Sequence, residues 1–238
     1  MLRNYRISPL TLVCMLFIVV NRILNNPYGS VREWLVQTIL ALPAILIAIS
    51  FHEFAHAKVA ELSGDDVPRR QGRVTLNPVA HIDPVGFFCL LFIGFGWGRP
   101  VEINAENFKK KRLDLLLVSL AGVTMNILLA FVFCGLWVLL AYKTALFNGD
   151  FGDILYTVFQ NIVVINLVLC VFNLIPVPPL DGFNVVTEIF NLRQTKFYHY
   201  AYQYGFIVLM ILIVFNFTDY LLTPAVSWLF RTIVGVFV

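Results

Sequence analysis

Long runs without a charged residue dominate this chain. Leu115 to Tyr142 covers 28 residues without a charge, and Ile154 to Leu180 covers 27. The hydrocarbon core of a bilayer is about 30 Å thick, so a helix that rises 1.5 Å per residue needs roughly 20 apolar residues to cross it. Both runs are long enough, although the prolines from Pro176 onward should end the second helix near Ile175. These runs predict an integral membrane protein.

Composition excludes the soluble alternatives. The chain is 59% hydrophobic and only 13% charged, whereas average soluble domains carry about 25% charged residues. There is too little polar side chain to cover a large soluble catalytic or recognition domain. The net charge of +3 is small and scattered, so no nucleic-acid partner is expected. The four cysteines are far apart and form no C-x-x-C pair, which argues against a disulfide framework and a Cys-ligated zinc.

Four further apolar segments bring the expected number of transmembrane helices to about six. They are Ile7 to Asn21, Trp34 to Phe51, Ala201 to Thr218 and Tyr220 to Val238. The first follows Arg3 and Arg6 and has no clear cleavage site, so we interpret it as a retained signal anchor. The predicted fold class is an all-α polytopic membrane protein, with residues 1–238 forming one membrane-embedded domain.

One apolar segment is too short to cross. Val85 to Gly98 is uncharged over only 14 residues and contains four glycines, so we expect a re-entrant glycine-rich loop or hairpin. If this segment returns to the side it came from and the N-terminus is cytoplasmic, thirteen of the 17 Lys and Arg residues lie on the cytoplasmic side. The positive-inside rule favours this orientation.

The residues with the clearest chemistry stand at the end of one predicted span. His52-Glu53-Phe54-Ala55-His56 is an H-E-x-x-H motif. On a helix, residues i and i+4 share a face, so both imidazoles can bind one Zn²⁺ while Glu53 serves as general base. Ionisable groups at membrane depth are costly and usually line a polar site. This favours a zinc centre over two structural histidines.

A catalytic zinc normally has three protein ligands, so one more is needed. Asp181 follows an apolar span and two prolines, and the non-helical backbone at these prolines can turn its carboxylate inward. His81 is the alternative, because its loop returns to the same predicted side. Glu61 points off the ligand face, and His199 lies at a predicted interface. Topology alone does not separate Asp181 from His81.

Several longer stretches carry a family pattern. They are His52 to His56, Gly72 to Pro78 continuing to His81 to Gly86, Gly94 to Val101, and Phe172 to Pro176 with Pro178 to Gly182. With them, nearly the whole chain resembles the site-2 protease family of intramembrane zinc metalloproteases. The resemblance implies that Asp181, in the L-D-G element, is the third zinc ligand. It also implies a compact member, because the chain has no room for a PDZ insertion or a CBS tail.

The family's G-P-x-x-N element matches only in part. It falls at Gly122-Val123-Thr124-Met125-Asn126, where valine stands in place of the usual proline. The resemblance gives Asn126 a catalytic, substrate-orienting role with its amide as a donor to the oxyanion. Periodicity alone favours a hydrogen bond between helices. Both interpretations stay open at this point.

The function implied by the resemblance is hydrolysis of peptide bonds in or near transmembrane helices, with one Zn²⁺ per chain. Its substrates would be single-span membrane proteins in the lipid bilayer, in regulated intramembrane proteolysis or remnant clearance. We expect a prokaryotic cytoplasmic membrane and an active site toward the cytoplasm. The alternative is a zinc-binding pseudoprotease, a chaperone or a metal transporter, and the retention of Glu53 beside His52, His56 and Asp181 favours the enzyme.

Overall fold

The computed structural model describes residues 29–93 and 96–238, and the regular structure within them is helical. Five of these helices are long and apolar enough to cross a membrane: α2 (Val31–Leu62), α5 (Lys111–Lys143), α6 (Gly149–Asn173), α8 (Lys196–Val214) and α9 (Phe217–Phe237). The sixth predicted span, Ile7 to Asn21, lies outside the described residues. Within the described ranges, one isolated bridge is the only β pairing. The all-α membrane fold is thus confirmed.

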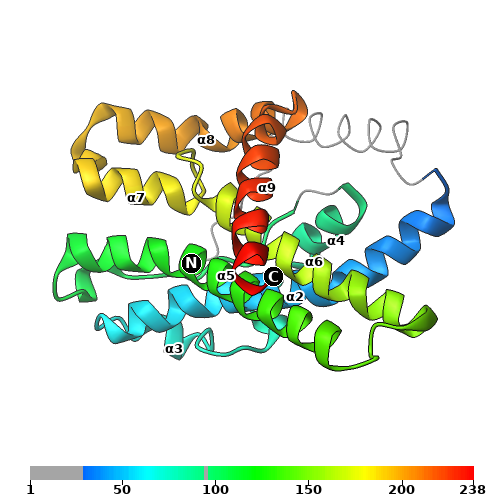
Figure 1. Cartoon of the computed structure of the whole chain (residues 1–238). Helices are drawn as coiled ribbons and strands as arrows, with labels where there is room; N and C mark the ends of the chain where they lie inside the picture. Colours follow the sequence, from blue (N-terminus) through cyan, green and yellow to red (C-terminus); the bar gives the residue numbers. More distant parts are fainter. Residues whose placement is uncertain (1–28, 94–95) are drawn as a thin grey trace.

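Helices α2, α5 and α6 pack against one another at the centre of the molecule (Figure 1). Helix α2 meets its neighbours through small side chains, and Ala44, Ala48, Ala57 and Ala60 are fully buried. Small residues let backbones approach closely, which is how transmembrane helices associate when lipid supplies no hydrophobic drive. With 32 residues, α2 is about 48 Å long. It therefore continues past the predicted span, through His52 and His56.

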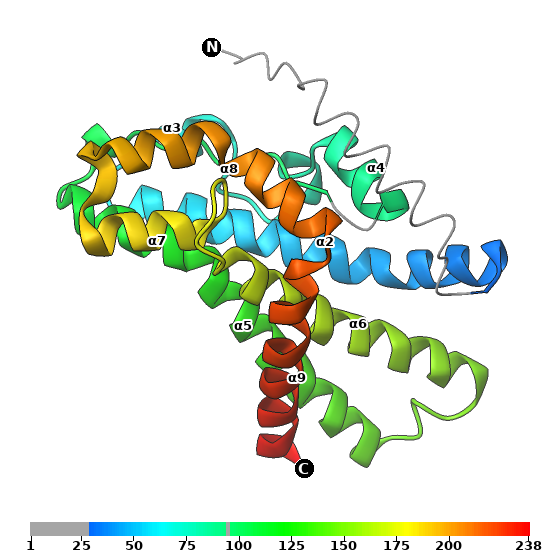
Figure 2. The ribbon, with the colours of Figure 1, turned by 90° about the horizontal axis from the view of Figure 1, so that it is seen from above.

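After α6 the chain turns into α7 (Asp181–Phe190), which packs on α5, and then returns as α8. Figures 1 and 2 show α7 and α8 as a hairpin on one side of the molecule, with α9 running from it across α5 and α6. Helix α7 is not foreseen from the sequence. The non-helical backbone predicted at the prolines is confirmed, and it ends at Leu180, so that Asp181 is the first residue of α7.

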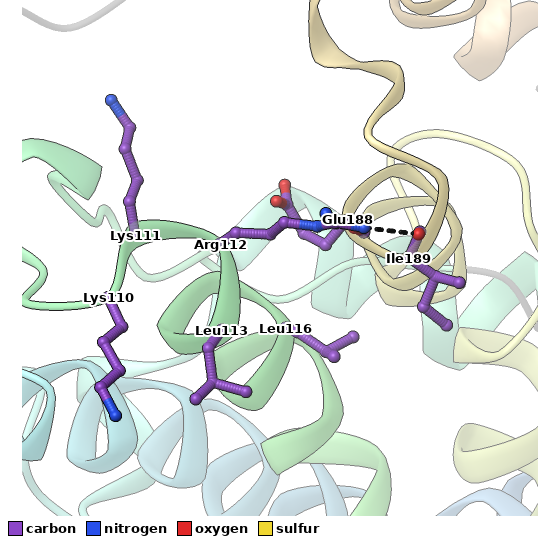
Figure 3. A pocket seen from close by; sticks show the side chains of 7 residues that line it. All are labelled: Lys110, Lys111, Arg112, Leu113, Leu116, Glu188 and Ile189. Atoms are coloured by element: carbon purple, nitrogen blue, oxygen red, sulfur yellow. Dashed lines mark hydrogen bonds between the residues drawn. The ribbon is translucent and has the colours of Figure 1, made fainter.

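The far end of α7 is attached to the start of α5. Arg112 donates from Nε to the carbonyl oxygen of Glu188 at 2.5 Å and from Nη2 to that of Ile189 at 2.6 Å (Figure 3). The last carbonyls of a helix have no partner within the helix, so a guanidinium there satisfies them and interacts favourably with the helix dipole. This contact fastens the end of α7 to α5.

The two ends of the segment predicted to be re-entrant lie side by side. Ile82 and Gly98 form an antiparallel bridge, and the Arg99 amide donates to the carbonyl oxygen of His81 at 2.7 Å. Its first part is a helix, α4 (Pro84–Ile93), not a loop. Asp83 accounts for the helix, because its Oδ1 accepts from the Gly86 amide at 2.8 Å and Pro84 suits the first turn. At 10 residues, or about 15 Å, α4 is too short to cross.

Candidate metal centre

The H-E-x-x-H motif lies on an unbroken part of α2. His52 and His56 are buried, with 6% and 8% of their surfaces exposed, and their Nε2 atoms are 3.0 Å apart. One helical turn separates the two residues, which brings both rings to the same side. The α2 backbone therefore supplies two converging nitrogen atoms, as the spacing predicts.

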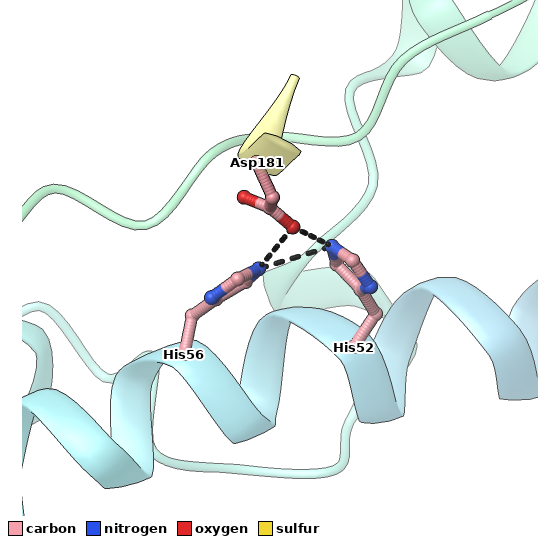
Figure 4. A group of neighbouring side chains, drawn as sticks. All are labelled: His52, His56 and Asp181. Atoms are coloured by element: carbon pink, nitrogen blue, oxygen red, sulfur yellow. Dashed lines mark hydrogen bonds and ion pairs between the residues drawn. The ribbon is translucent and has the colours of Figure 1, made fainter. Parts of the chain in front are cut away.

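Asp181 reaches these nitrogens from the start of α7. Its Oδ2 is 3.3 Å from His52 Nε2 and 3.2 Å from His56 Nε2 (Figure 4). The next residue, Gly182, makes the approach feasible, because a Cβ there would lie 2.2 Å from the Leu174 carbonyl oxygen at the end of α6. The pKa of Asp181 is below its ordinary value: burial would raise it, but interaction with the imidazoles of His56 and His52 outweighs burial.

The hydrogen bonds behind the two rings leave both Nε2 atoms without a proton in the neutral imidazoles. His56 Nδ1 donates to the Val118 carbonyl oxygen at 2.7 Å, and His52 Nδ1 donates to Asn126 Oδ1 at 2.6 Å. A neutral imidazole carries one N–H group, so each Nε2 presents a lone pair. Asp181 Oδ2 is buried and, among the residues that the structure describes, has no hydrogen-bond partner beyond its contacts with these two Nε2 atoms. When both imidazoles are neutral and the Asp181 carboxyl is deprotonated, three lone pairs converge with no proton among them, which is the arrangement that a cation stabilises.

The spacing of these atoms suits zinc. Zn²⁺ binds His nitrogen and carboxylate oxygen at about 2.0–2.2 Å, and a tetrahedron of that size has edges of about 3.3–3.6 Å. The three separations of 3.0, 3.2 and 3.3 Å come close to these edges. Three protein ligands also leave one position open, as in catalytic zinc sites. His52, His56 and Asp181 could therefore hold the metal.

Helix α5 has a glycine, Gly122, where it faces the rings of His52 and His56. A Cβ on Gly122 would lie 2.5 Å from His52 Cε1 and 2.5 Å from His56 Nε2. Real Cβ atoms do not make such contacts, so any other residue would push the rings away.

Comparison with known proteins agrees with this geometry. The model of peptidase family M50 matches residues 40–212, a range that contains His52, His56 and Asp181. The chain belongs to peptidase family M50, the site-2 protease family. It is therefore a metallopeptidase of a zinc-dependent family, and Zn²⁺ is its cofactor.

Relatives of this M50 protein carry matching names. It is 41% identical over 183 residues to "Putative zinc metalloprotease YwhC" of Bacillus subtilis, covering 77% of this chain and 84% of the relative. It is 28% identical over 206 residues to a protein with the same description, Rip2 of Mycolicibacterium smegmatis, covering 82% and 71%. No solved structure shows significant similarity to the chain.

The other candidate ligands of this M50 chain lie outside the cluster. His81 is fully buried, but its Nε2 contacts the Thr75 carbonyl oxygen at 2.7 Å, and burial lowers its pKa. His199 is exposed on α8 and contacts the Thr195 carbonyl oxygen. Glu61 pairs with Lys58 and Arg69. The structure thus brings Asp181, and not His81, to the paired histidines.

Glu53 faces the returning limb of the re-entrant segment. Its Oε2 accepts from the Val101 amide at 3.2 Å, and a Cβ on Gly98 would lie 3.6 Å from its Oε1. Arg73, which the sequence did not single out, fastens this limb: it is 3% exposed and donates to the carbonyl oxygens of Ala80 and Arg99. The sequence feature that could have identified Arg73 is its position as the single arginine of the Gly72 to Pro78 stretch.

Asn126 lies behind the metal centre. Its Nδ2 donates to the Ala48 carbonyl oxygen at 3.2 Å and to Asn166 Oδ1 at 2.9 Å. The helix-to-helix hydrogen bond expected from periodicity is confirmed. Both N–H groups are engaged, so the catalytic role predicted for Asn126 has no free donor for an oxyanion in this arrangement. Asn166, which is fully buried, was missed, although an amide in the middle of an apolar span is a signal that the sequence offers.

Proposed function

We propose that this protein is a zinc metalloendopeptidase that cuts peptide bonds in or near the transmembrane helices of single-span membrane proteins. The observation that carries the proposal is the convergence of Asp181 with His52 and His56, which share with Glu53 a helix long and apolar enough to cross a bilayer. We place the protein in a prokaryotic cytoplasmic membrane with this centre toward the cytoplasm, which the distribution of basic residues favours. Regulated proteolysis and remnant clearance both fit this activity.

In this mechanism Glu53 moves the proton. Zinc, when bound by His52, His56 and Asp181, would polarise the scissile carbonyl and make water a nucleophile near neutral pH. Glu53 stands one residue from His52 and takes the proton from the attacking water as general base. It then delivers that proton to the nitrogen of the leaving amine. The carboxylate is held nearby by the Val101 amide, a contact long enough at 3.2 Å to be exchanged for water or substrate.

The returning limb suits an extended substrate. In an intact substrate helix every carbonyl is bonded within the helix, so cleavage requires local opening. An opened stretch loses its backbone partners, and a neighbouring extended segment can restore them by β-type pairing. Residues 98–101 run beside Glu53 without helical structure, so a substrate paired there would pass the general base.

The Glu53→Gln variant tests the proposal. It should retain one equivalent of zinc, because Glu53 is not among the three ligands, and should lose peptidase activity by about 10²- to 10⁴-fold, as expected for a lost general base. Zinc is measured by mass spectrometry on the purified protein, and cleavage with a single-span substrate in proteoliposomes. Glu106→Gln, at an exposed glutamate, is the matched control.

Cleavage by Glu53→Gln at the rate of the unmodified protein would contradict the assignment of the base. A zinc-loaded but inactive unmodified protein, tested against many substrates, would instead favour a zinc-binding pseudoprotease or transporter.

The orientation has its own test. Cysteines introduced at Asn148 and Arg70, in a background without the four native cysteines, should be labelled from opposite sides by a membrane-impermeant reagent. Both positions are exposed, one before α6 and the other in α3 (Val67–Arg70), beyond the end of α2. We expect Asn148→Cys to react in intact cells and Arg70→Cys only after lysis. The opposite pattern would put the metal centre on the outer side.

A further inference from the structure

A buried amide on α6 contacts the group behind the metal centre. Asn166 is 0% exposed, in the middle of an apolar helix. Its Nδ2 donates to the Ile162 carbonyl oxygen at 2.8 Å, and its Oδ1 accepts from Asn126 Nδ2 at 2.9 Å. The bond to Ile162 determines which way the Asn166 amide faces, because a carbonyl oxygen can only accept. Its Oδ1 is therefore the atom that faces Asn126.

The orientation of Asn126 follows by the same reasoning. Its Nδ2 has two acceptors, Asn166 Oδ1 and the Ala48 carbonyl oxygen. Since neither acceptor can donate, the nitrogen must face them, and Oδ1 must face His52. There it accepts from Nδ1 at 2.6 Å. A flipped Asn126 amide would place its Oδ1 against two acceptors and lose both of those bonds.

The chain of bonds ends at a proposed metal ligand. With its proton on Nδ1, His52 presents the bare Nε2 toward Asp181 Oδ2 and His56 Nε2. The other tautomer would direct a proton into this space. Hydrogen bonds to the far nitrogen of a ligating histidine are the usual means of setting its tautomer and ring orientation.

We propose that Asn166 is a positioning residue that acts through Asn126 to hold His52 in its metal-binding tautomer and orientation. This rests on the proposed function, in which His52 binds zinc. The bonds join α6, α5 and α2, so the packing of these three helices is coupled to the geometry of the ligand. Asn166 itself contacts none of the three ligand atoms.

The test is the zinc affinity of the purified full chain, measured by competition with a chromogenic chelator. Loss of a hydrogen-bonding partner behind a ligand typically costs 10- to 100-fold in metal affinity. Asn126→Leu should fall in that range, and Asn166→Leu, one bond further away, should be about 10-fold weaker than the unmodified protein. The double variant should bind no more weakly than Asn126→Leu alone, because Asn166 acts only through Asn126.

A conservative variant separates hydrogen bonding from packing. In Asn166→Asp the carboxyl is protonated at this depth, so its O–H donates to the Ile162 carbonyl while its other oxygen accepts from Asn126. Zinc affinity should return close to that of the unmodified protein. Thr157→Val is the control, because it removes a similar side-chain bond, to the Asp153 carbonyl, from a partly exposed position on the same helix.

Unchanged affinity in Asn166→Leu would overturn the proposal. So would equal losses in the Leu and Asp variants, or losses that add in the double variant, since packing alone would then explain them. Absence of zinc from the unmodified protein would instead overturn the proposed function.

Discussion

Replacing Asp181 by alanine is expected to remove zinc and peptidase activity together. The change deletes one of three ligands and also the negative charge that offsets the metal. His52 and His56 alone would leave two neutral nitrogens 3.0 Å apart in a buried site, which is too few for a catalytic zinc centre. We expect the purified variant to contain much less than one equivalent of zinc by mass spectrometry and to show no measurable cleavage.

Two controls make this result specific. Asp150→Ala removes an exposed acidic residue from the first turn of α6. Asp181 also lies in the first turn of its helix, so Asp150→Ala measures the effect of losing a favourable charge at a helix start without losing a metal ligand. His81→Ala tests the alternative third ligand. Both should retain stoichiometric zinc. If His81→Ala lost zinc while Asp181→Ala kept it, the centre would contain three histidines, and the ligand assignment would be wrong.

The sequence could predict those parts of the metal centre that come from residues close together in the chain. His52 and His56 share one helix, so their spacing alone places both rings on one face. Asp181 lies far along the chain, and from topology His81 was an equal candidate. The prolines before Asp181 favoured it and the resemblance added to that choice, because its position depends on how the α6–α7 turn packs against α2. That packing in turn needs Gly182 beside Leu174 and Arg112 at the far end of α7.

The helices also divide into those that the sequence predicts and those that it does not. Uncharged runs predict the long helices, since crossing a bilayer imposes both length and composition. Helices α4 and α7 have 10 residues each, too few for that signal. The start of α4 depends on one side-chain contact, the Asp83 carboxylate accepting from the Gly86 amide, and α7 is held by its packing against α5. The partners of Asn126 were also beyond the sequence, because they depend on the rotation of α2, α5 and α6 about their axes.

Alanine at Gly122 should abolish zinc binding although it adds a single methyl group. The new Cβ would lie 2.5 Å from His52 Cε1, 2.6 Å from His52 Nδ1 and 2.5 Å from His56 Nε2. A flexible side chain could move aside, but these rings are held from behind by Asn126 and by the Val118 carbonyl. The methyl group therefore has to displace a ring or separate α5 from α2, and both changes disrupt the three-ligand arrangement.

Helix propensity does not explain a loss of zinc in Gly122→Ala. Alanine is favoured over glycine in a helix by about 1 kcal/mol, so α5 itself should not be weakened by the substitution. Gly235→Ala makes the same change in α9, where a Cβ would meet no atom within 4 Å, and should keep zinc and activity. We expect Gly122→Ala to remain helical by circular dichroism, with zinc lost by mass spectrometry and cleavage absent in proteoliposomes. A Gly122→Ala protein that binds zinc as tightly as Gly235→Ala would mean that the rings can yield, and that the close approach of α5 is not what shapes the metal centre.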